Sequence, residues 1–152
     1  MTIPVIRIAG DADGPALAAL RRAWTVEQNG EVDDAGFEAR FLDWYERESG
    51  RRVSWLAETD GQLVGMMNLT VFDRMPQPGR DPVSWGYLAN AFVLDAHRRQ
   101  GTGSRMLREL LAYADEHGYV RVVLNPSDLS VSLYQRHGFS AEHHLLVRQR
   151  AR

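Results

Sequence analysis

Apolar positions recur in short runs along the chain, and their spacing predicts alternating strands and helices. Residues 5–8 read as a first strand, and Pro15 lies at the start of the helix that follows. A second amphipathic helix is expected after a polar stretch, ending near Gly50. The apolar faces of these two helices carry Leu17, Leu20 and Trp24, then Phe37, Phe41, Trp44 and Tyr45.

The middle of the chain is rich in β-forming residues. Residues 53–59 and 62–71 should form an antiparallel hairpin, because Asp60-Gly61 between them suits a two-residue turn with positive φ. A proline-rich loop is expected over residues 75–82. The nearly continuous apolar run over residues 85–94 predicts a strand buried on both faces, at the centre of the sheet.

The last third predicts a parallel crossover. A helix over residues 103–117 should end at Gly118, and a strand over residues 120–124 would return beside the central strand. A short helix over residues 130–136 and a final strand over residues 141–148 complete the order. We therefore expect an α/β fold with a central mixed sheet, antiparallel strands first and a parallel βαβ unit later, flanked by about four helices.

Composition narrows the class of protein. A chain of 152 residues, 44% of them apolar, fits one domain over 1–152. Its net charge of -2 argues against nucleic-acid binding and favours small-molecule partners. It has no cysteine for a disulfide or thiol intermediate, and no run of ~20 apolar residues for a membrane span. The lack of such a run leads us to expect no membrane partner and a cytoplasmic location. His143-His144 lack a third ligand at recognisable spacing, so we also expect no metal.

The glycine-rich loop before the 103–117 helix is the first candidate site. Gly101 and Gly103 would let an anion approach the free N–H groups of the helix start. Arginines crowd the same place, where the helix dipole disfavours cations by ~0.3–1 kcal/mol each, and a bound anion would remove that conflict. The arginines are Arg98, Arg99, Arg105 and Arg108. A solvated basic loop is the alternative to an anion site.

Two common phosphate motifs do not fit this loop. A Walker loop needs lysine followed by serine or threonine, and Gly103-Ser104-Arg105 has neither in register. The third glycine of the dinucleotide fingerprint would fall on Met106. A shorter diphosphate cradle is the interpretation that is left.

Three segments resemble the GNAT superfamily of N-acetyltransferases. The stretch from Tyr87 to Gly103, with Arg98-x-x-Gly101-x-Gly103 after an apolar strand, is similar to the family's acetyl-CoA-binding motif. Leu133-Tyr134-Gln135-Arg136-His137-Gly138-Phe139 resembles its Leu-Tyr-x-x-x-Gly-Phe segment, and the hairpin from Glu58 to Gly65 is also typical. The resemblance covers about residues 55–139.

The resemblance implies that acetyl-CoA is the co-substrate. Backbone groups of residues 91–93 would pair with its pantetheine, and amides of residues 99–104 would hold its diphosphate, after Arg98 opens the motif. Ser127 stands where many relatives have a cofactor-contacting asparagine, two residues after Asn125, and a simple turn is the alternative there. The predicted cofactor-binding residues are Ala91, Phe92, Val93, Arg98, Arg99, Gln100, Gly101, Thr102, Gly103, Ser104, Asn125, Ser127 and Ser130.

For catalysis, the resemblance gives Tyr134 the role of general acid, which would protonate the departing thiolate; anchoring of a short helix is its alternative. No glutamate stands out as a base, and Asn90 could orient a water or be a simple sheet residue. Candidate acceptor contacts are Trp24, Glu27 and Tyr45. Glu27 belongs to an acidic cluster with Glu31, Asp33 and Asp34, which would attract a cationic amine or simply be solvated.

The sequence thus predicts an N-acetyltransferase that moves an acetyl group from acetyl-CoA directly to a primary amine. The amine would belong to a small molecule, with an amine of a peptide or protein as the less favoured alternative. One alternative is a catalytically silent acyl-CoA-binding regulatory module, because the base is missing. Another alternative is an acyltransferase that uses a longer acyl-CoA. For the oligomeric state, we expect a homodimer.

Overall fold

A computed structural model describes residues 2–151, and its five strands form a single mixed sheet in chain order. The first four strands pair antiparallel, whereas the last two pair parallel. The strands are β1 (Val5–Ile8), β2 (Arg52–Thr59), β3 (Gln62–Asp73), β4 (Ser84–Val93) and β5 (Val122–Leu124). The predicted fold class is confirmed.

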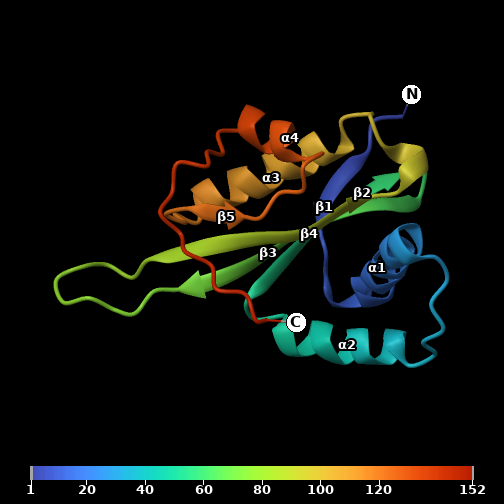
Figure 1. The fold of residues 1–152 in the computed structure, drawn as a ribbon, viewed down its shortest axis with the longest axis horizontal. Coiled ribbons are helices and arrows are strands. Elements are labelled where there is room, and N and C mark those ends of the chain that lie inside the picture. Colours follow the sequence, from blue (N-terminus) through green and yellow to red (C-terminus); the bar gives the residue numbers. More distant parts are fainter. Residues whose placement is uncertain (1, 152) are drawn as a thin grey trace.

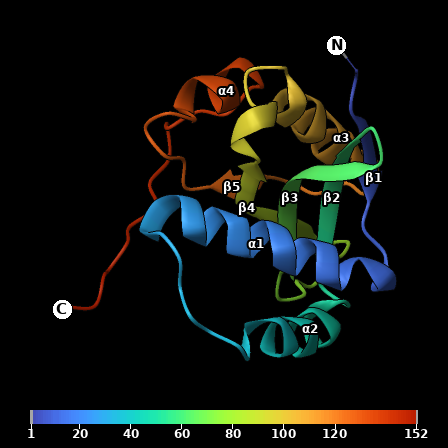
Figure 2. The ribbon, with the colours of Figure 1, turned by 90° about the vertical axis from the view of Figure 1, so that its right-hand side faces the viewer.

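The helices form two layers, one on each face of the sheet (Figures 1 and 2). One layer holds α1 (Gly14–Asn29) and α2 (Phe37–Glu48), and the other holds α3 (Thr102–Glu116) and α4 (Val131–Arg136). Short 3-10 turns, η1 (Asp11–Asp13) and η2 (Asp95–His97), precede α1 and α3. The sheet is therefore covered from both sides.

Two apolar clusters fill the spaces between these layers. On the α3 face, helix residues pack on β2 and β3; on the α1 face, other helix residues pack on β2, β3 and β4. Trp55 and Leu56 are neighbours in sequence yet belong to different clusters, as the alternation of a strand requires. The helix residues are Met106, Leu107 and Leu110 from α3, and Leu17 and Leu20 from α1.

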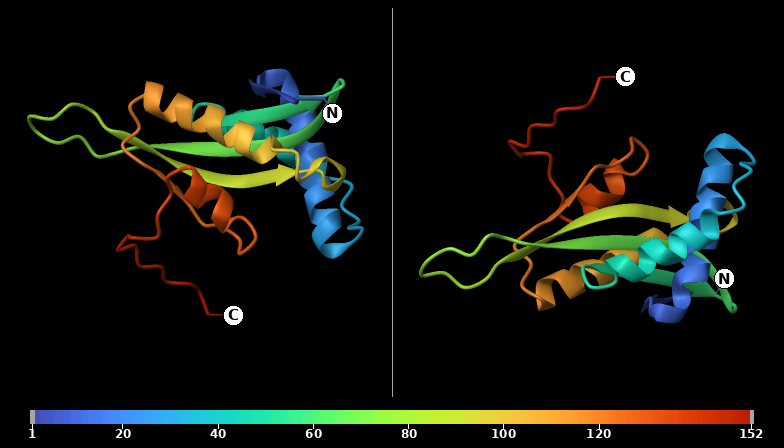
Figure 3. Two further views of the ribbon diagram at one scale, coloured as in Figure 1. Left: turned by 90° about the horizontal axis from the view of Figure 1, so that it is seen from above. Right: turned by 90° about the horizontal axis from the view of Figure 1, so that it is seen from below.

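The two hairpins of the sheet have different turns. Asp60 and Gly61 adopt φ of 51° and 78° between the paired residues Thr59 and Gln62, so the predicted two-residue turn is confirmed. The proline-rich segment between β3 and β4 is a long loop that projects beyond the helices (Figure 3).

None of the helices described over residues 2–151 is both long and apolar enough to cross a membrane.

Three sequence expectations need correction. The strand predicted over residues 141–148 does not form, and Leu145, Leu146 and Val147 are 58%, 97% and 81% exposed. Those apolar residues are consecutive, so they lack the alternation that would give a strand one buried face. The strand expected over residues 120–124 shortens to β5, and the middle of the five-stranded sheet is β3 rather than β4.

Core packing on α3 gives a direct stability test. Leu110→Ala should lower the free energy of unfolding by about 2–5 kcal/mol, because the side chain is fully buried and its removal leaves a cavity. Leu146→Ala removes the same atoms from an exposed position and should change the free energy of unfolding by less than about 0.5 kcal/mol. Urea denaturation of both variants measures this; equal losses would contradict the described C-terminal segment.

Candidate functional site

β4 and β5 separate part-way along their length, and a cleft opens between them. Their pairing ends at Leu88 and Leu124, while β4 continues to Val93. The cleft has a volume of about 500 Å³. Beyond Leu88, this side of β4 has no neighbouring strand among residues 2–151, so its backbone is open to a ligand.

The cleft brings together residues from distant parts of the chain. Most of the sequence-predicted site residues line it: Trp24, Asn90, Ala91, Phe92, Val93, Arg98, Arg99, Gly103, Asn125, Ser127, Ser130 and Tyr134. Gln100, Gly101, Thr102 and Ser104 belong to the adjoining loop and helix start but do not line the cleft itself. Glu27 reaches it only through its contact with Arg98.

Sequence patterns missed part of the apolar lining. Apart from Met67 on β3, these residues lie one or two positions from predicted ones, and only the separation of the strands reveals which of them face the cleft. They are Met67, Leu88, Ala89, Met106, Leu124, Pro126, Leu129 and Leu133.

A bulge in β4 places Asn90 beside the cleft. The β3–β4 register shifts between Met66 and Asn68, and Asn90 takes a φ of 54°, which is uncommon for a residue other than glycine. The Asn68 side-chain amide donates to the Asn90 carbonyl at 2.9 Å, and the Ser54 hydroxyl donates to the Asn68 side-chain oxygen at 2.6 Å. A polar row across β2, β3 and β4 therefore holds the bulge in place.

The start of α3 presents a continuous set of free backbone donors. None of the amides from Arg99 through Ser104 donates to another group within residues 2–151; the first helical bond runs from the Arg105 amide to the Gly101 carbonyl. Arg99 and Gly101 have positive φ values of 61° and 80°, which turn the chain sharply into the helix. Donors of this kind with the positive end of the helix dipole suit a phosphate group.

The side chain of Arg98 is engaged away from these amides. Its guanidinium donates to the Val93 carbonyl at 2.9 Å and to Glu27 at 2.6 Å, and it also contacts Asp95. The hydrogen bond from Arg98 lowers the pKa of the Glu27 carboxyl. Arg98 thus fastens the end of α1 to the end of β4, and one of the four arginines at the helix start is already paired.

The acidic cluster after α1 is partly neutralised in the same way. Asp34 pairs with Arg40, and the hydrogen bond from that arginine lowers the pKa of Asp34. Glu27 pairs with Arg98. The attraction that the sequence suggested for a cationic amine is therefore weaker than a count of acidic residues implies.

Aromatic rings form one wall of the cleft. Trp24 stacks on Phe92 with ring centroids 5.7 Å apart and planes inclined by 8°. The guanidinium of Arg98 lies 5.5 Å from the Phe92 ring centroid. This flat, largely apolar wall lies at the α1 side of the cleft.

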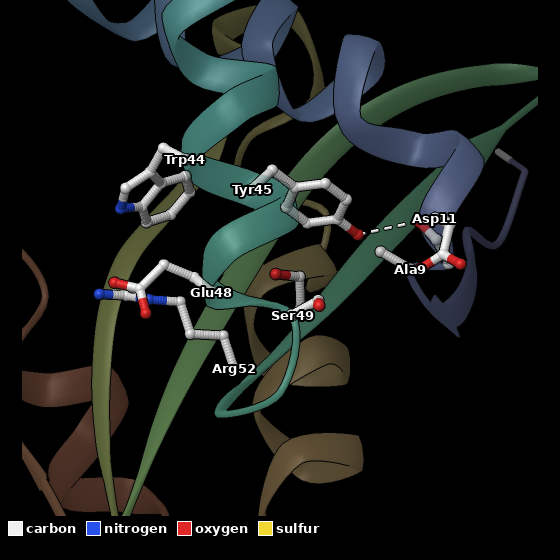
Figure 4. A pocket seen from close by; sticks show the side chains of 9 residues that line it. Ala9, Asp11, Trp44, Tyr45, Glu48, Ser49 and Arg52 are labelled. Carbon is white, nitrogen blue, oxygen red and sulfur yellow. Dashed lines mark hydrogen bonds and ion pairs between the residues drawn. The ribbon is translucent and has the colours of Figure 1, made fainter.

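Tyr45 lies in a different cavity, between the end of α2 and the start of β2 (Figure 4). Its hydroxyl donates to the Gly10 carbonyl at 2.8 Å, and burial raises its pKa. This cavity has a volume of about 70 Å³, and Trp44, Glu48 and Arg52 also line it. The predicted acceptor residues Trp24 and Tyr45 are therefore not brought together.

Tyr134 is buried at the α4 side of the cleft, where it is only 6% exposed. Its ring packs edge-on against Phe139 with centroids 5.6 Å apart, and no residue of the described chain hydrogen-bonds its hydroxyl. Burial raises the pKa of Tyr134, so the phenol keeps its proton at neutral pH. The hydroxyl is thus available as a proton donor within the cleft.

The cleft lining offers no carboxylate base. No Asp or Glu is among its lining residues. Within residues 2–151, no group of three or more His, Asp or Glu side chains is placed to hold a metal ion. The polar chemistry of the cleft therefore comes from backbone amides, Asn90, Arg99, three polar residues of the β5–α4 segment and Tyr134.

A comparison with protein families matches residues 17–139 to the acetyltransferase (GNAT) family. The chain belongs to the GNAT acetyltransferase family. The matched segment includes Trp24, the bulged β4, the free amides of α3 and Tyr134, which are the elements that build the cleft.

Curated relatives share part of this segment. Mouse N-acetyltransferase family 8 member 3 is 36% identical over 91 residues, or 56% of this chain and 37% of the relative. Human N-acetyltransferase 8 is 35% identical over 89 residues, again 56% and 37% of the two chains. The match thus spans well under half the length of these relatives.

Solved structures share the fold over nearly the whole chain. A predicted acetyltransferase from Clostridium acetobutylicum, solved with acetyl-CoA, has a TM-score of 0.78 and 20% identity, covering 97% of this chain and 96% of its own. A GCN5-related N-acetyltransferase from Ralstonia eutropha JMP134 has a TM-score of 0.72 and 24% identity, covering 97% and 99%. These likenesses establish the fold of this GNAT member.

The polar row behind the bulge can be tested by stability. Asn68→Ala should lower the free energy of unfolding by about 1–3 kcal/mol, because the Ser54 hydroxyl and the Asn90 carbonyl lose their partner. Asn68→Asp keeps the shape and can still accept from Ser54, but it cannot donate to Asn90. Chemical denaturation should show a lower free energy of unfolding for both variants. An unchanged free energy of unfolding in Asn68→Asp would contradict the role given to this donor.

Proposed function

We propose that this protein is an acetyl-CoA-dependent N-acetyltransferase that acetylates a primary amine, belonging to a small molecule rather than a peptide. The observation that carries the proposal is the course of β4, which runs without a β5 neighbour from Leu88 to Val93 and leads to the free amides at α3. An extended chain that ends in a diphosphate fits this combination.

The unpaired part of β4 suits pantetheine. Pantetheine contains two amides in an extended chain, which can hydrogen-bond to a strand edge as a neighbouring strand would. The backbone from Ala91 to Val93 supplies that edge, and the cleft walls there are mostly apolar. Asn125, Ser127 and Ser130 face it from the β5–α4 side and offer side-chain hydrogen bonds.

The free amides from Arg99 through Ser104 suit the diphosphate. They gather at one helix start, where the helix dipole favours negative charge by about 0.3–1 kcal/mol or more. Arg99 lines the cleft and adds a positive charge, whereas Arg98 is paired with Glu27 and serves the strand end. The chain's donor set therefore fits acetyl-CoA, which supplies the acetyl group as a reactive thioester.

In the proposed reaction, the neutral amine attacks the thioester carbonyl carbon within a ternary complex. The new C–N bond forms as the C–S bond breaks, and the departing sulfur takes a proton. Tyr134 is the donor we assign, because its side chain is largely buried at the cleft and its protonated hydroxyl has no hydrogen-bond partner among residues 2–151. A backbone N–H near Val93 is the donor proposed for the charge that develops on the carbonyl oxygen.

The amine must lose a proton, and no carboxylate lines the cleft to take it. We assign Asn90 the role of holding a water that carries the proton to solvent, because its side chain is exposed at the bulge beside the cleft. The Trp24–Phe92 wall is the proposed contact surface for the acceptor. Glu27 contributes by orienting Arg98 rather than as the base, since its pKa is lowered.

Two rival functions have distinct outcomes in one assay. A catalytically silent acyl-CoA-binding module would bind acetyl-CoA without releasing thiol with any amine. An acyltransferase for longer chains would release thiol faster from a longer acyl-CoA than from acetyl-CoA. Thiol release measured with a panel of amines and donors separates both from the proposed enzyme, and failure to bind acetyl-CoA at high micromolar concentration would overturn the proposal.

A cytoplasmic location, a homodimer and the absence of nucleic-acid or membrane partners stay predictions from the sequence. The exposed apolar residues Leu145, Leu146 and Val147 support self-association, because such runs favour burial in an interface. Sedimentation equilibrium of the wild type and of a variant with serine at all three positions tests the homodimer. A wild type that stays monomeric at all concentrations would exclude it.

The general acid is tested by Tyr134→Phe. This variant should lower kcat by about 100-fold or more and leave the affinity for acetyl-CoA within about threefold, because only the proton donor is lost. Tyr119→Phe removes a hydroxyl from a tyrosine that does not line the cleft and should keep near-normal kcat. Steady-state kinetics and calorimetry measure both effects; equal kcat values for the two variants would rule out the role given to Tyr134.

The diphosphate cradle is tested at Gly103. A Cβ there would meet its nearest neighbour, Leu133, at 3.7 Å, an ordinary contact, so Gly103→Glu should fold. The new carboxylate would occupy the anion site and lower acetyl-CoA affinity by at least about tenfold, or ~1.4 kcal/mol. Gly103→Gln, with similar bulk and no charge, should lower the affinity for acetyl-CoA clearly less than Gly103→Glu does. Calorimetry compares them, and equal affinities would contradict the assignment of the cradle.

A further inference from the structure

We infer that His137, acting through the hydroxyl of Ser104, couples binding of the diphosphate to uptake of a proton, which makes His137 a positioning residue of the cofactor site. This inference rests on the proposed function, because the anion in question is the diphosphate of acetyl-CoA. His137 closes α4 and lies apart from the cleft lining, so neither motif nor cavity identifies it.

Two contacts define the protonation chemistry of His137. Its Nδ1 lies 2.8 Å from the Leu133 carbonyl oxygen, and its Nε2 lies 3.1 Å from the Ser104 hydroxyl oxygen. A carbonyl can only accept, so Nδ1 carries a proton and donates it to Leu133. In the neutral ring, Nε2 is therefore an acceptor, and the Ser104 hydroxyl donates to it.

This arrangement uses up the only proton of the Ser104 hydroxyl. Ser104 is in the first turn of α3, and its amide is one of the free donors at the proposed diphosphate site. When His137 takes up a proton, its Nε2–H donates to the Ser104 oxygen instead. The Ser104 O–H no longer donates to His137, and it can turn to donate to an oxygen of the diphosphate.

The charge of a bound anion favours this exchange. The charged residues on α4 and on the first two turns of α3 are all cationic, namely Arg136, Arg105 and Arg108. In the loop before α3, Arg98 is paired with Glu27 and Asp95, and Arg99 lines the cleft. A diphosphate bound at the free amides of this helix start would add negative charge near Ser104 and His137, which favours the protonated ring.

By linkage, an anion that favours protonated His137 binds more tightly as the pH falls. Histidine is the side chain that ordinarily changes charge between pH 5 and 8. We therefore expect the affinity for the ligand to rise by several-fold to about tenfold between pH 8 and pH 6. Proton uptake should accompany binding over the same range.

The experiment uses acetyl-CoA without its 3′-phosphate as the probe, because a phosphate monoester itself titrates near pH 6. Calorimetry from pH 6 to pH 8.5, in buffers with different ionisation enthalpies, gives both the affinity and the number of protons taken up. The wild type should show the pH dependence; His137→Gln and Ser104→Ala should show a nearly flat affinity and little proton uptake.

His117→Gln is the matched control. His117 closes α3, and its Nδ1 makes the same kind of contact, to the Tyr113 carbonyl at 2.9 Å. It lies at the opposite end of the helix, about 20 Å from Ser104 at 1.5 Å per residue. His117→Gln should keep the full pH dependence of the wild type.

Two further measurements keep the outcomes distinct. Turnover with S-acetylpantetheine, which has no diphosphate, should show the same pH dependence in the wild type and His137→Gln. If the His137 variant fails to fold, the NMR titration midpoint of His137 in the wild type should still move to higher pH when the probe binds. Retention of the pH dependence in both His137→Gln and Ser104→Ala would overturn the inference, whereas a wild type that binds no probe would overturn the proposed function.

Discussion

The site depends on one constraint, the hydrogen bond from the Asn68 side chain to the Asn90 carbonyl. This bond holds the bulge of β4, where Asn90 adopts a positive φ and the register against β3 shifts. A regular β4 would continue beside β5 and would leave its edge paired. Because the strands separate after Leu88, backbone groups that normally complete a sheet are free to bind a ligand.

The two layers of helices have different tasks around this opening. On one face, α3 packs its apolar residues into the larger cluster and presents its first amides beside the end of β4. On the other face, α1 carries Trp24 onto Phe92 and Glu27 onto Arg98. The same strand end is therefore fixed from both sides, so a disturbance of either layer reaches the cleft.

The proposed chemistry relies on burial rather than on charged side chains. Tyr134 is the proposed proton donor because burial raises its pKa and because no neighbour in the described chain hydrogen-bonds its hydroxyl. The charged groups nearby are mostly committed to each other, as Arg98 is to Glu27. His137 is different, because the group it contacts, Ser104, belongs to the proposed diphosphate site.

The sequence alone determined the order of elements as far as α4, the Asp60-Gly61 turn and the family, since these depend on local spacing and on motifs. It indicated most residues of the cleft for the same reason. Only the tertiary structure decided that Arg98 turns to Glu27, that Tyr45 lies in another cavity, and that residues 141–148 form no strand. Each of these depends on contacts between segments far apart in sequence or on the absence of a partner strand, which no local pattern encodes.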